Sequence, residues 1–283
     1  PLQSFGMEAQ YEFAFRTLQN GLNVGKIVVR IVAARVSAGS RGCHIVTGGT
    51  GGLGLLTGRW LAQVGTRHLI LASRGGALAH DTAVEWDAVQ ATCALTSLER
   101  CDAGEAVHVH RLMTLAPSLN GVWHAAGILV DGTLRKQDAS ALARVYAPKA
   151  HGAWSLHATC LATAMSAFAL FSSIAASLGS AGQANYAAAN ACLDALAAYR
   201  RAQGSTGTSV QWGAWAGVGM AARGVASERM SRMEASSGMG RIGLAQGLSA
   251  LDMATRCVAP SVLSVVPVVW NRFLFGAAAV PTF

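Results

Sequence analysis

The chain has 283 residues, enough for one large domain or two modest ones with a sizeable buried core. Lys and Arg total 22 against 14 Asp and Glu, a formal net charge of +8, yet only 13% of residues are charged and 52% are hydrophobic. This composition excludes a disordered chain, and the 32 glycines argue against a coiled coil or a helical array. A compact α/β domain is the expected class.

The beginning of the chain differs in pattern from the rest. A short helical pattern at 11–18 is followed by a strand-like segment at 26–32 and a polar linker at 37–42. We therefore predict two parts, residues 1–40 and 41–283.

From residue 43 onward, strands alternate with helices. The strands are predicted at 44–47, 68–72, 95–101, 120–124, 167–171, 209–212 and 262–269, and 95–101 is the weakest because two charges interrupt it. The helices are predicted at 53–64, 83–92 and 184–201. Apolar strands with helices between them predict a Rossmann-like, doubly wound parallel sheet with helices on both faces. Ligands bind such sheets beyond the carboxyl ends of the strands, so the segments after each strand are expected to carry the function.

Residues 150–193 contain no Asp, Glu, Lys or Arg, which raises the question of a membrane span. Serines, glycines and asparagines interrupt this stretch, so a buried strand, a polar loop and a buried helix fit it better. The chain does not open with a signal-peptide pattern. We expect no membrane partner and a cytoplasmic location.

The six cysteines form no CxxC pair, and we expect them to be reduced thiols. His108 and His110 could share the face of a strand, but no third ligand is near them in the sequence, so no metal site is predicted.

A glycine-rich segment, TGGTGGLG at 47–54, lies between the first strand and the first helix of the larger part. Gly48, Gly52 and Gly54 would allow a tight turn, close approach of a pyrophosphate, and packing of the helix on the strand. The helix N-terminus would offer its free N–H groups to the phosphate oxygens. A structural turn is the alternative, but the context favours a dinucleotide site.

The end of the next strand reads Leu71-Ala72-Ser73-Arg74, without an acidic residue. An acid there would bind the ribose 2′-hydroxyl, whereas an arginine accepts a 2′-phosphate. The segment therefore favours NADPH over NADH, although Arg74 could also be a solvated surface charge.

Four polar residues form a second constellation: Lys149, Ser173, Tyr186 and Asn190. Ser173 follows an apolar strand, and Tyr186 and Asn190 are four apart on one helix face. A tyrosine phenol can protonate a carbonyl oxygen during reduction if a nearby cation stabilises the phenolate, and Lys149 could be that cation. Taken singly, these residues could equally be a buried tyrosine, a capping serine and a surface lysine.

The combined motifs resemble the ketoreductase domain of a polyketide synthase, a branch of the short-chain dehydrogenase/reductase superfamily. Most members of that superfamily carry Tyr-x-x-x-Lys, but these ketoreductases have asparagine there and the lysine upstream, as in Tyr186-x-x-x-Asn190 with Lys149. The resemblance extends over roughly residues 42–275. The other matching segments are 123–127 (Trp-His-Ala-Ala-Gly), 147–154 (Ala-Pro-Lys-Ala-His-Gly-Ala-Trp), 171–173 (Phe-Ser-Ser) and 211–215 (Gln-Trp-Gly-Ala-Trp).

This resemblance implies catalytic roles. Tyr186 would be the proton donor and Ser173 would anchor the carbonyl oxygen. Lys149 would hold the nicotinamide ribose and the tyrosine, and Asn190 would support the lysine or a water relay.

The resemblance also implies NADPH as the cofactor, with Asp102 at the adenine and Arg74 at the phosphate. The complete set of implied cofactor-binding residues is Gly48, Thr50, Gly51, Gly52, Leu53, Gly54, Ser73, Arg74, Asp102, Ala125 and Gly127.

Three further positions correspond to those that control the substrate and its stereochemistry in the family: Asp131, Leu178 and Gln183. The B type has Leu-Asp-Asp where this chain has Leu129-Val130-Asp131, and the A type has a Trp where this chain has Leu178. The pattern resembles a B-type ketoreductase, which gives a D-hydroxy product.

Residues 1–40 resemble the C-terminal tail of an enoyl reductase, a domain that precedes the ketoreductase catalytic half in reducing synthases. The resemblance implies a fragment of a megasynthase whose structural half lies upstream. The implied partners are a phosphopantetheine-bound β-ketoacyl chain on an acyl carrier protein and the other domains of the same synthase. A basic rim at Arg135, Lys136 and Arg144 could attract an acidic carrier protein, and no basic cluster indicates nucleic acid.

The expected activity is therefore NADPH-dependent reduction of a β-ketoacyl thioester to a β-hydroxyacyl thioester. The main alternative is a catalytically silent scaffold domain of a megasynthase, which the intact set of four active-site residues disfavours. A short-chain reductase acting on free small molecules is disfavoured by Asn190 and by the enoyl-reductase-like flank.

Overall fold

The computed structural model describes residues 2–6, 12, 15–21, 26–30, 42–79, 82–116, 118–217, 238–256 and 258–275. The chain divides into two compact units, Pro1–Val36 and Ser37–Phe283. Each unit is described by itself.

The first unit contains two parallel strands, β1 (Leu2–Gly6) and β2 (Lys26–Arg30). Residues 15–19 between them are helical, so the unit is a small β-α-β arrangement. The strand predicted at 26–32 is confirmed as β2, whereas its partner β1 was not predicted. The predicted linker at 37–42 lies outside the described residues, apart from residue 42.

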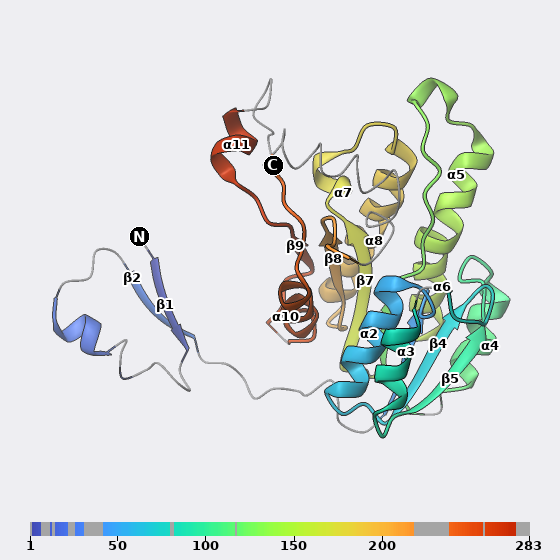
Figure 1. The fold of residues 1–283 in the computed structure, drawn as a ribbon, viewed down its shortest axis with the longest axis horizontal. Coiled ribbons are helices and arrows are strands. Elements are labelled where there is room, and N and C mark those ends of the chain that lie inside the picture. The colour runs from blue at the N-terminus through green and yellow to red at the C-terminus, as the bar shows by residue number, and fades with distance from the viewer. Residues whose placement is uncertain are drawn as a thin grey trace. The chain divides into compact units, whose positions relative to one another are not determined.

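The second unit is built on a seven-stranded parallel sheet with the strand order β5-β4-β3-β6-β7-β8-β9 (Figure 1). The chain order reverses between β3 and β6, which is where a doubly wound sheet opens a ligand crevice. The predicted fold class is confirmed. The strands are β3 (Cys43–Thr47), β4 (His68–Ser73), β5 (Leu95–Arg100), β6 (Leu119–His124), β7 (Ala167–Ser173), β8 (Thr208–Trp212) and β9 (Val262–Val265).

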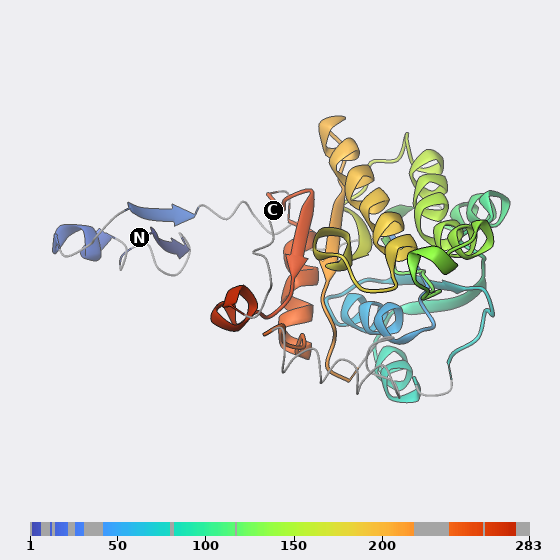
Figure 2. The ribbon, with the colours of Figure 1, turned by 90° about the horizontal axis from the view of Figure 1, so that it is seen from above.

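Helices lie on both sides of this sheet (Figure 2). The α-helices are α2 (Gly52–Gln63), α3 (Ala83–Gln90), α4 (Ala106–Thr114), α5 (Ala139–Tyr146), α6 (Gly152–Thr159), α7 (Ala175–Leu178), α8 (Ala184–Ala202), α10 (Leu244–Ala254) and α11 (Trp270–Phe275). A 3₁₀ turn, η1 (Leu134–Lys136), precedes α5, and a π-helical turn, η2 (Ala147–His151), joins α5 to α6.

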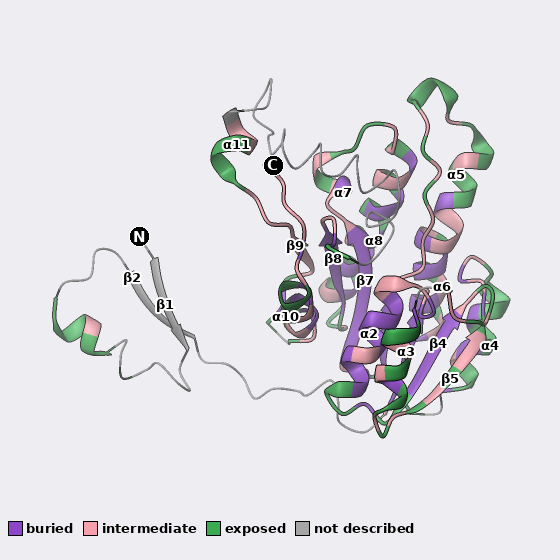
Figure 3. Ribbon diagram, viewed as in Figure 1, coloured by how far each residue is buried: buried purple, intermediate pink, exposed green. Residues whose placement is uncertain are grey.

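Two hydrophobic cores lie on the two faces of the sheet, and the strands between them are mostly buried (Figure 3). On one face, side chains of α2 and α10, including Leu56 and Leu251, pack against the strands. On the other face, α4, α6 and α8 contribute Leu112, Leu156 and Leu193. Burial of both faces explains why the central strands are continuous apolar runs, as a parallel sheet requires.

Several elements were not predicted from the sequence, and others were predicted at the wrong place. Histidines 108 and 110 lie on helix α4, so the idea that they share a strand face is wrong. Strand β9 ends at Val265, four residues earlier than predicted, just before Pro267, whose missing N–H cannot continue a ladder. The doubtful strand at 95–101 is a regular edge strand, β5, because its charged end faces solvent at the sheet margin.

Within the described residues, no helix is long and apolar enough to cross a membrane. The five cysteines in the described part of the chain are free thiols.

Candidate functional site

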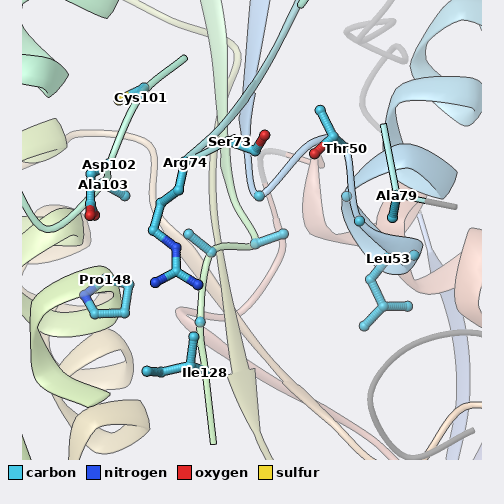
Figure 4. A pocket seen from close by; sticks show the side chains of 17 residues that line it. Thr50, Leu53, Ser73, Arg74, Ala79, Cys101, Asp102, Ala103, Ile128 and Pro148 are labelled. Atoms are coloured by element: carbon cyan, nitrogen blue, oxygen red, sulfur yellow. The ribbon is translucent and has the colours of Figure 1, made fainter. Parts of the chain in front are cut away.

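A pocket of about 310 Å³ opens at the carboxyl ends of the central strands. Its walls come from the segments that follow β3, β4, β5 and β6, together with Pro148 of η2 (Figure 4). All eleven residues predicted to bind the cofactor line it. The lining residues that the sequence did not suggest are Ala79, Cys101, Ala103, Ala126, Ile128 and Pro148.

The glycine turn after β3 has no room for a side chain at Gly48 or at Gly54. Gly48 has φ +69°, and a Cβ there would lie 2.8 Å from the backbone carbon of Ala125. A Cβ on Gly54 would collide with the backbone oxygen of Gly48. The turn therefore places helix α2 close against strand β3 and leaves bare backbone facing the pocket.

The first turn of α2 points its backbone N–H groups at the pocket. Gly51 caps this helix without a side-chain hydrogen bond, and its first turn contains no acidic residue. Unpaired N–H groups together with the positive end of the helix dipole make this a suitable place for an anion such as a pyrophosphate.

Arg74 and Asp102 lie on the opposite wall from Thr50 and Leu53 (Figure 4). The Arg74 guanidinium extends into the open space near Pro148, as that figure shows. Asp102 Oδ1 accepts a hydrogen bond of 2.9 Å from the Gly104 amide, which fixes the loop after β5.

A second hollow of about 340 Å³ adjoins the pocket and shares Arg74 and Asp102 with it. It is also lined by Leu129 and Arg144. The sequence placed Arg144 on an outer basic rim with Arg135 and Lys136. All three are exposed, and Arg144 in addition faces the same hollow as Arg74.

Lys149 sits in the π-helical turn η2 and is only 3% exposed. Its Nζ donates a hydrogen bond of 2.8 Å to the backbone oxygen of Phe171 in β7. Burial lowers the pKa of Lys149 to about 7, and the negative charge of Asp194 acts in the opposite direction. The ammonium is therefore poised between its charged and neutral forms near neutral pH.

Lys149 adjoins the pocket through Gly127. A Cβ on Gly127 would lie 2.8 Å from Cε of Lys149 and 3.3 Å from its Nζ, so only glycine lets the lysine approach this pocket-lining backbone. His124 connects the end of β3 with η2: its Nδ1 is 2.7 Å from Thr47 Oγ1, and its Nε2 is 3.1 Å from the Lys149 backbone oxygen. Burial lowers the pKa of His124 to about 4, and the charge of Lys149 adds to this, so the imidazole is neutral.

Tyr186 lies in the first turn of α8, where its ring centroid is 5.3 Å from the Lys149 Nζ. This separation is within the range of a cation–π contact. Burial raises the pKa of the Tyr186 phenol, the side chains of Asn190 and Ser173 lower it, and Asp131 raises it. The structure thus brings the predicted lysine, serine, tyrosine and asparagine together from three separate segments.

Asn190 is fully buried one helical turn after Tyr186. Its Nδ2 donates a 2.8 Å hydrogen bond to the Tyr186 backbone oxygen, and its own backbone oxygen accepts a 3.3 Å bond from Ser172 Oγ. No donor among the described residues meets its Oδ1 in hydrogen-bonding geometry.

The predicted stereocontrol residues lie on two segments that contact each other. Asp131 accepts hydrogen bonds of 3.1 and 3.4 Å from Nε2 of Gln183, the residue that precedes α8. Asn185 Nδ2 donates 2.9 Å to the Val130 backbone oxygen, which ties the same loop to the start of α8. Leu178 ends α7 and is half-buried.

Sequence reasoning missed two polar residues of this region, His124 and Asp194. His124 stands at the end of a predicted strand, where site residues were expected, so its position in the sequence could have identified it. Asp194 lies on the predicted long helix one turn beyond Asn190, and only the fold shows that it faces strand β8.

A doubly wound sheet with a glycine turn at its switch point, and a Lys, Ser and Tyr converging beside the pocket, defines a dinucleotide-binding enzyme fold of the short-chain dehydrogenase/reductase type. The chain belongs to the KR domain family, which it matches over residues 42–217.

Polyketide synthases are among the proteins to which the chain is similar. The chain is 41% identical over 246 residues to the spectinabilin polyketide synthase system protein NorB of Streptomyces orinoci, and 39% identical over 242 residues to the polyketide synthase GfsB of Streptomyces halstedii. These alignments cover 85% and 84% of the chain but only 11% and 4% of the two relatives.

Solved structures agree with this assignment. The first ketoreductase of the tylosin synthase is 35% identical with a TM-score of 0.76, over 89% of this chain and 55% of that one. An A-type ketoreductase from a modular polyketide synthase is 33% identical with a TM-score of 0.78, over 89% and 54%. The chain therefore corresponds to about half of these ketoreductases.

Proposed function

We propose that this chain reduces the ketone of a β-ketoacyl thioester, carried on the phosphopantetheine arm of an acyl carrier protein, to a β-hydroxyacyl thioester. When bound, NADPH supplies the hydride that reaches the carbonyl carbon. The observation that carries the proposal is the convergence of Lys149, Tyr186 and Ser173 beside a pocket lined by every predicted cofactor residue.

The pocket suits a nicotinamide dinucleotide. The side-chain-free turn at Gly48 and Gly54 and the uncapped start of α2 would hold the pyrophosphate. Arg74 would pair with the 2′-phosphate, and Asp102 would contact the adenine. An arginine rather than an acid after β4 is the reason to propose NADPH instead of NADH.

Tyr186 would donate its phenolic proton to the carbonyl oxygen as negative charge develops there. Because burial raises its pKa, the phenol keeps this proton at neutral pH and has it available. The Lys149 ammonium beside the ring would stabilise the phenolate that remains, and would also bind the nicotinamide ribose. Ser173, at the end of β7, would hold the carbonyl oxygen by a hydrogen bond, and Asn190 would support the lysine or a water relay.

The B-type assignment is part of the proposal. Asp131, bound to Gln183, would shape the substrate entrance, and the position of the A-type Trp is Leu178. The product would carry a D-hydroxyl group.

We also propose that the chain works as one part of a larger synthase. The segments that match this chain make up only 11% and 4% of two polyketide synthase proteins, and the partners would be a carrier protein and other domains of the same synthase. Residues 1–40 would be the tail of an enoyl reductase and a linker.

The test is a spectrophotometric assay of the full chain with NADPH and a β-ketoacyl thioester or trans-1-decalone, followed by chiral analysis of the product. We expect turnover, and we expect Tyr186→Phe to lower kcat at least a hundredfold while NADPH binding and the melting temperature stay near the wild-type values. Turnover by Tyr186→Phe equal to the wild type would refute the mechanism. NADPH binding without any turnover would favour the silent scaffold, and an L-hydroxy product would refute only the B-type assignment.

A further inference from the structure

A carboxylate that the proposed mechanism does not use lies on the catalytic helix. Asp194 follows Asn190 by four residues and Tyr186 by eight, so the three lie along one side of α8 over about 12 Å. Its Oδ1 accepts a 2.6 Å hydrogen bond from Ser209 Oγ, and its Oδ2 accepts a 2.7 Å bond from Gln211 Nε2. Both partners are buried on β8, so the carboxylate ties the helix directly to the sheet.

The connection continues from β8 to the segment that follows the predicted carbonyl anchor. Gln211 Oε1 accepts hydrogen bonds from Ser177 Oγ on α7 at 3.0 Å and from Ser264 Oγ on β9 at 2.7 Å. Gln211 is also the register partner of Ser172, the residue before Ser173. A single polar network therefore joins α8, which carries Tyr186, to β8, β9 and α7, the helix that follows Ser173.

The acceptor and donor roles in this network are mutually consistent. The Gln211 amide oxygen receives two serine hydroxyls and its NH₂ group faces Asp194, and a carboxylate is a group that accepts from both an amide and a hydroxyl.

Lys149 donates to the backbone oxygen of Phe171, and the β8 register partner of Phe171 is Val210, which lies between Ser209 and Gln211, the two residues that hold Asp194. The negative charge of Asp194 therefore lies close enough to act on Lys149, which burial otherwise pushes towards its neutral form.

His124 of β6 and Tyr186 of α8 are titratable groups that interact with the lysine. Arg144 and Tyr146 of α5, His157 of α6 and Cys192 of α8 lie on the elements packed against η2. His124 is neutral because burial lowers its pKa to about 4, and it meets the lysine only through the backbone oxygen.

We propose that Asp194 is a positioning residue for the reduction: it fixes α8, with Tyr186 and Asn190, against β8 and serves as the counter-charge that keeps Lys149 an ammonium. This inference rests on the proposed function, because it assigns Asp194 a part in aligning and charging that same set of groups.

Asp194→Asn is the informative variant because it keeps the shape and removes the charge. The amide oxygen can still accept from Gln211, and the amide NH₂ can donate to the Ser209 hydroxyl. Without the negative charge, the Lys149 pKa falls further, so the alkaline limb of kcat/KM should move down by about one pH unit. NADPH affinity measured by fluorescence should also weaken more at pH 8 than at pH 6.

Two companion variants separate charge from attachment. Ser209→Ala removes one hydrogen bond but keeps the carboxylate, and should lower kcat about threefold to tenfold without moving the alkaline limb. Asp252→Asn is the matched control, because Asp252 is an exposed carboxylate of α10 that pairs with Arg256. It should change neither kcat nor the alkaline limb. Melting temperatures of all three verify folding.

An alkaline limb and a pH-dependent NADPH affinity that are the same in Asp194→Asn and wild type would overturn the inference. A uniform loss of kcat at every pH would overturn the counter-charge role, because that is the result expected if Asp194 only attached α8 to β8. Absence of turnover in the wild type would instead refute the proposed function, and the NADPH affinities would still decide whether Asp194 sets the charge of Lys149.

Discussion

The glycine turn after β3 and the cluster around Lys149 lie at the same edge of the sheet but are built on opposite principles. At Gly48 and Gly54, the backbone comes so close to other backbone that any side chain would collide. Around Lys149, Tyr186 and Ser173, the geometry depends on long side chains that converge from different segments. A binding surface made of backbone is specified locally, whereas an arrangement of side chains is specified by the whole fold.

This difference has an energetic side. The turn uses N–H groups that are left unpaired at every helix start, so the chain does not have to bury a charge there. The cluster buries an ammonium that donates a hydrogen bond to the backbone oxygen of Phe171, which carries no full charge. Such burial costs free energy, and the cost is acceptable only where a function requires the charge.

The largest effect is expected from a substitution in the glycine turn, where the site is made of backbone. Gly54→Ala should weaken NADPH binding more than a hundredfold, because the new Cβ would meet the Gly48 backbone oxygen and force the turn open. Equilibrium binding monitored by NADPH fluorescence measures this. Gly75→Ala is the control, since the nearest atom to its Cβ would be 3.9 Å away. Equal affinity in Gly54→Ala and wild type would contradict the close packing.

A smaller effect is expected at the wall of the pocket opposite the turn. Arg74→Ala should reduce affinity for NADPH about tenfold and leave affinity for NADH nearly unchanged, because an exposed guanidinium pairs with the 2′-phosphate that only NADPH has. The ratio of the two dissociation constants is the measurement. Arg67→Ala, just before the same strand β4 at the other end of the sheet, should leave that ratio alone. An unchanged ratio in Arg74→Ala would remove the basis for preferring NADPH.

The smallest expected effect is a change in thermal stability, and it tests the energetic contrast. Lys149→Met should abolish turnover yet raise the melting temperature by a few degrees at pH 6, because an apolar side chain replaces a buried cation. The Lys149 pKa of about 7 in the folded chain lies below its ordinary unfolded value of about 10.4. The unfolded state therefore holds more protons between these two values, and wild-type stability rises with pH across that window. The gain from Lys149→Met should accordingly shrink from pH 7 towards pH 10.

Melting curves at several pH values test this prediction. Lys136→Met, at an exposed lysine of η1, serves as the control and should show no pH-dependent gain. A gain in Lys149→Met that does not vary with pH would show that the buried lysine is not the cause.

The same contrast explains what could be predicted from the sequence. The turn at 47–54 and the apolar strands around it could be predicted from the sequence, because each depends on a short stretch of chain. The residues alone left the convergence of Lys149 with Tyr186 as one of several alternatives, and the family resemblance favoured it, since the two residues are 37 positions apart with α6, β7 and α7 between them. Helices α5 and α6 were missed because the π-helical turn η2 between them interrupts the regular spacing that signals a helix. Asp194 was missed because its partners lie on a strand that follows much later.

The π-helical turn also restricts how this part of the chain can vary in length. A π-turn holds one residue more than the α-turn it replaces, so the residues after it are rotated by about 100° relative to an uninterrupted helix. Val145 before the turn and Ala153 and Leu156 after it are all fully buried, with Lys149 between them. Loss or gain of one residue here would leave a plausible helix but turn one half of it away from the interior. Insertions and deletions, which surface loops accept readily, are therefore excluded from this stretch.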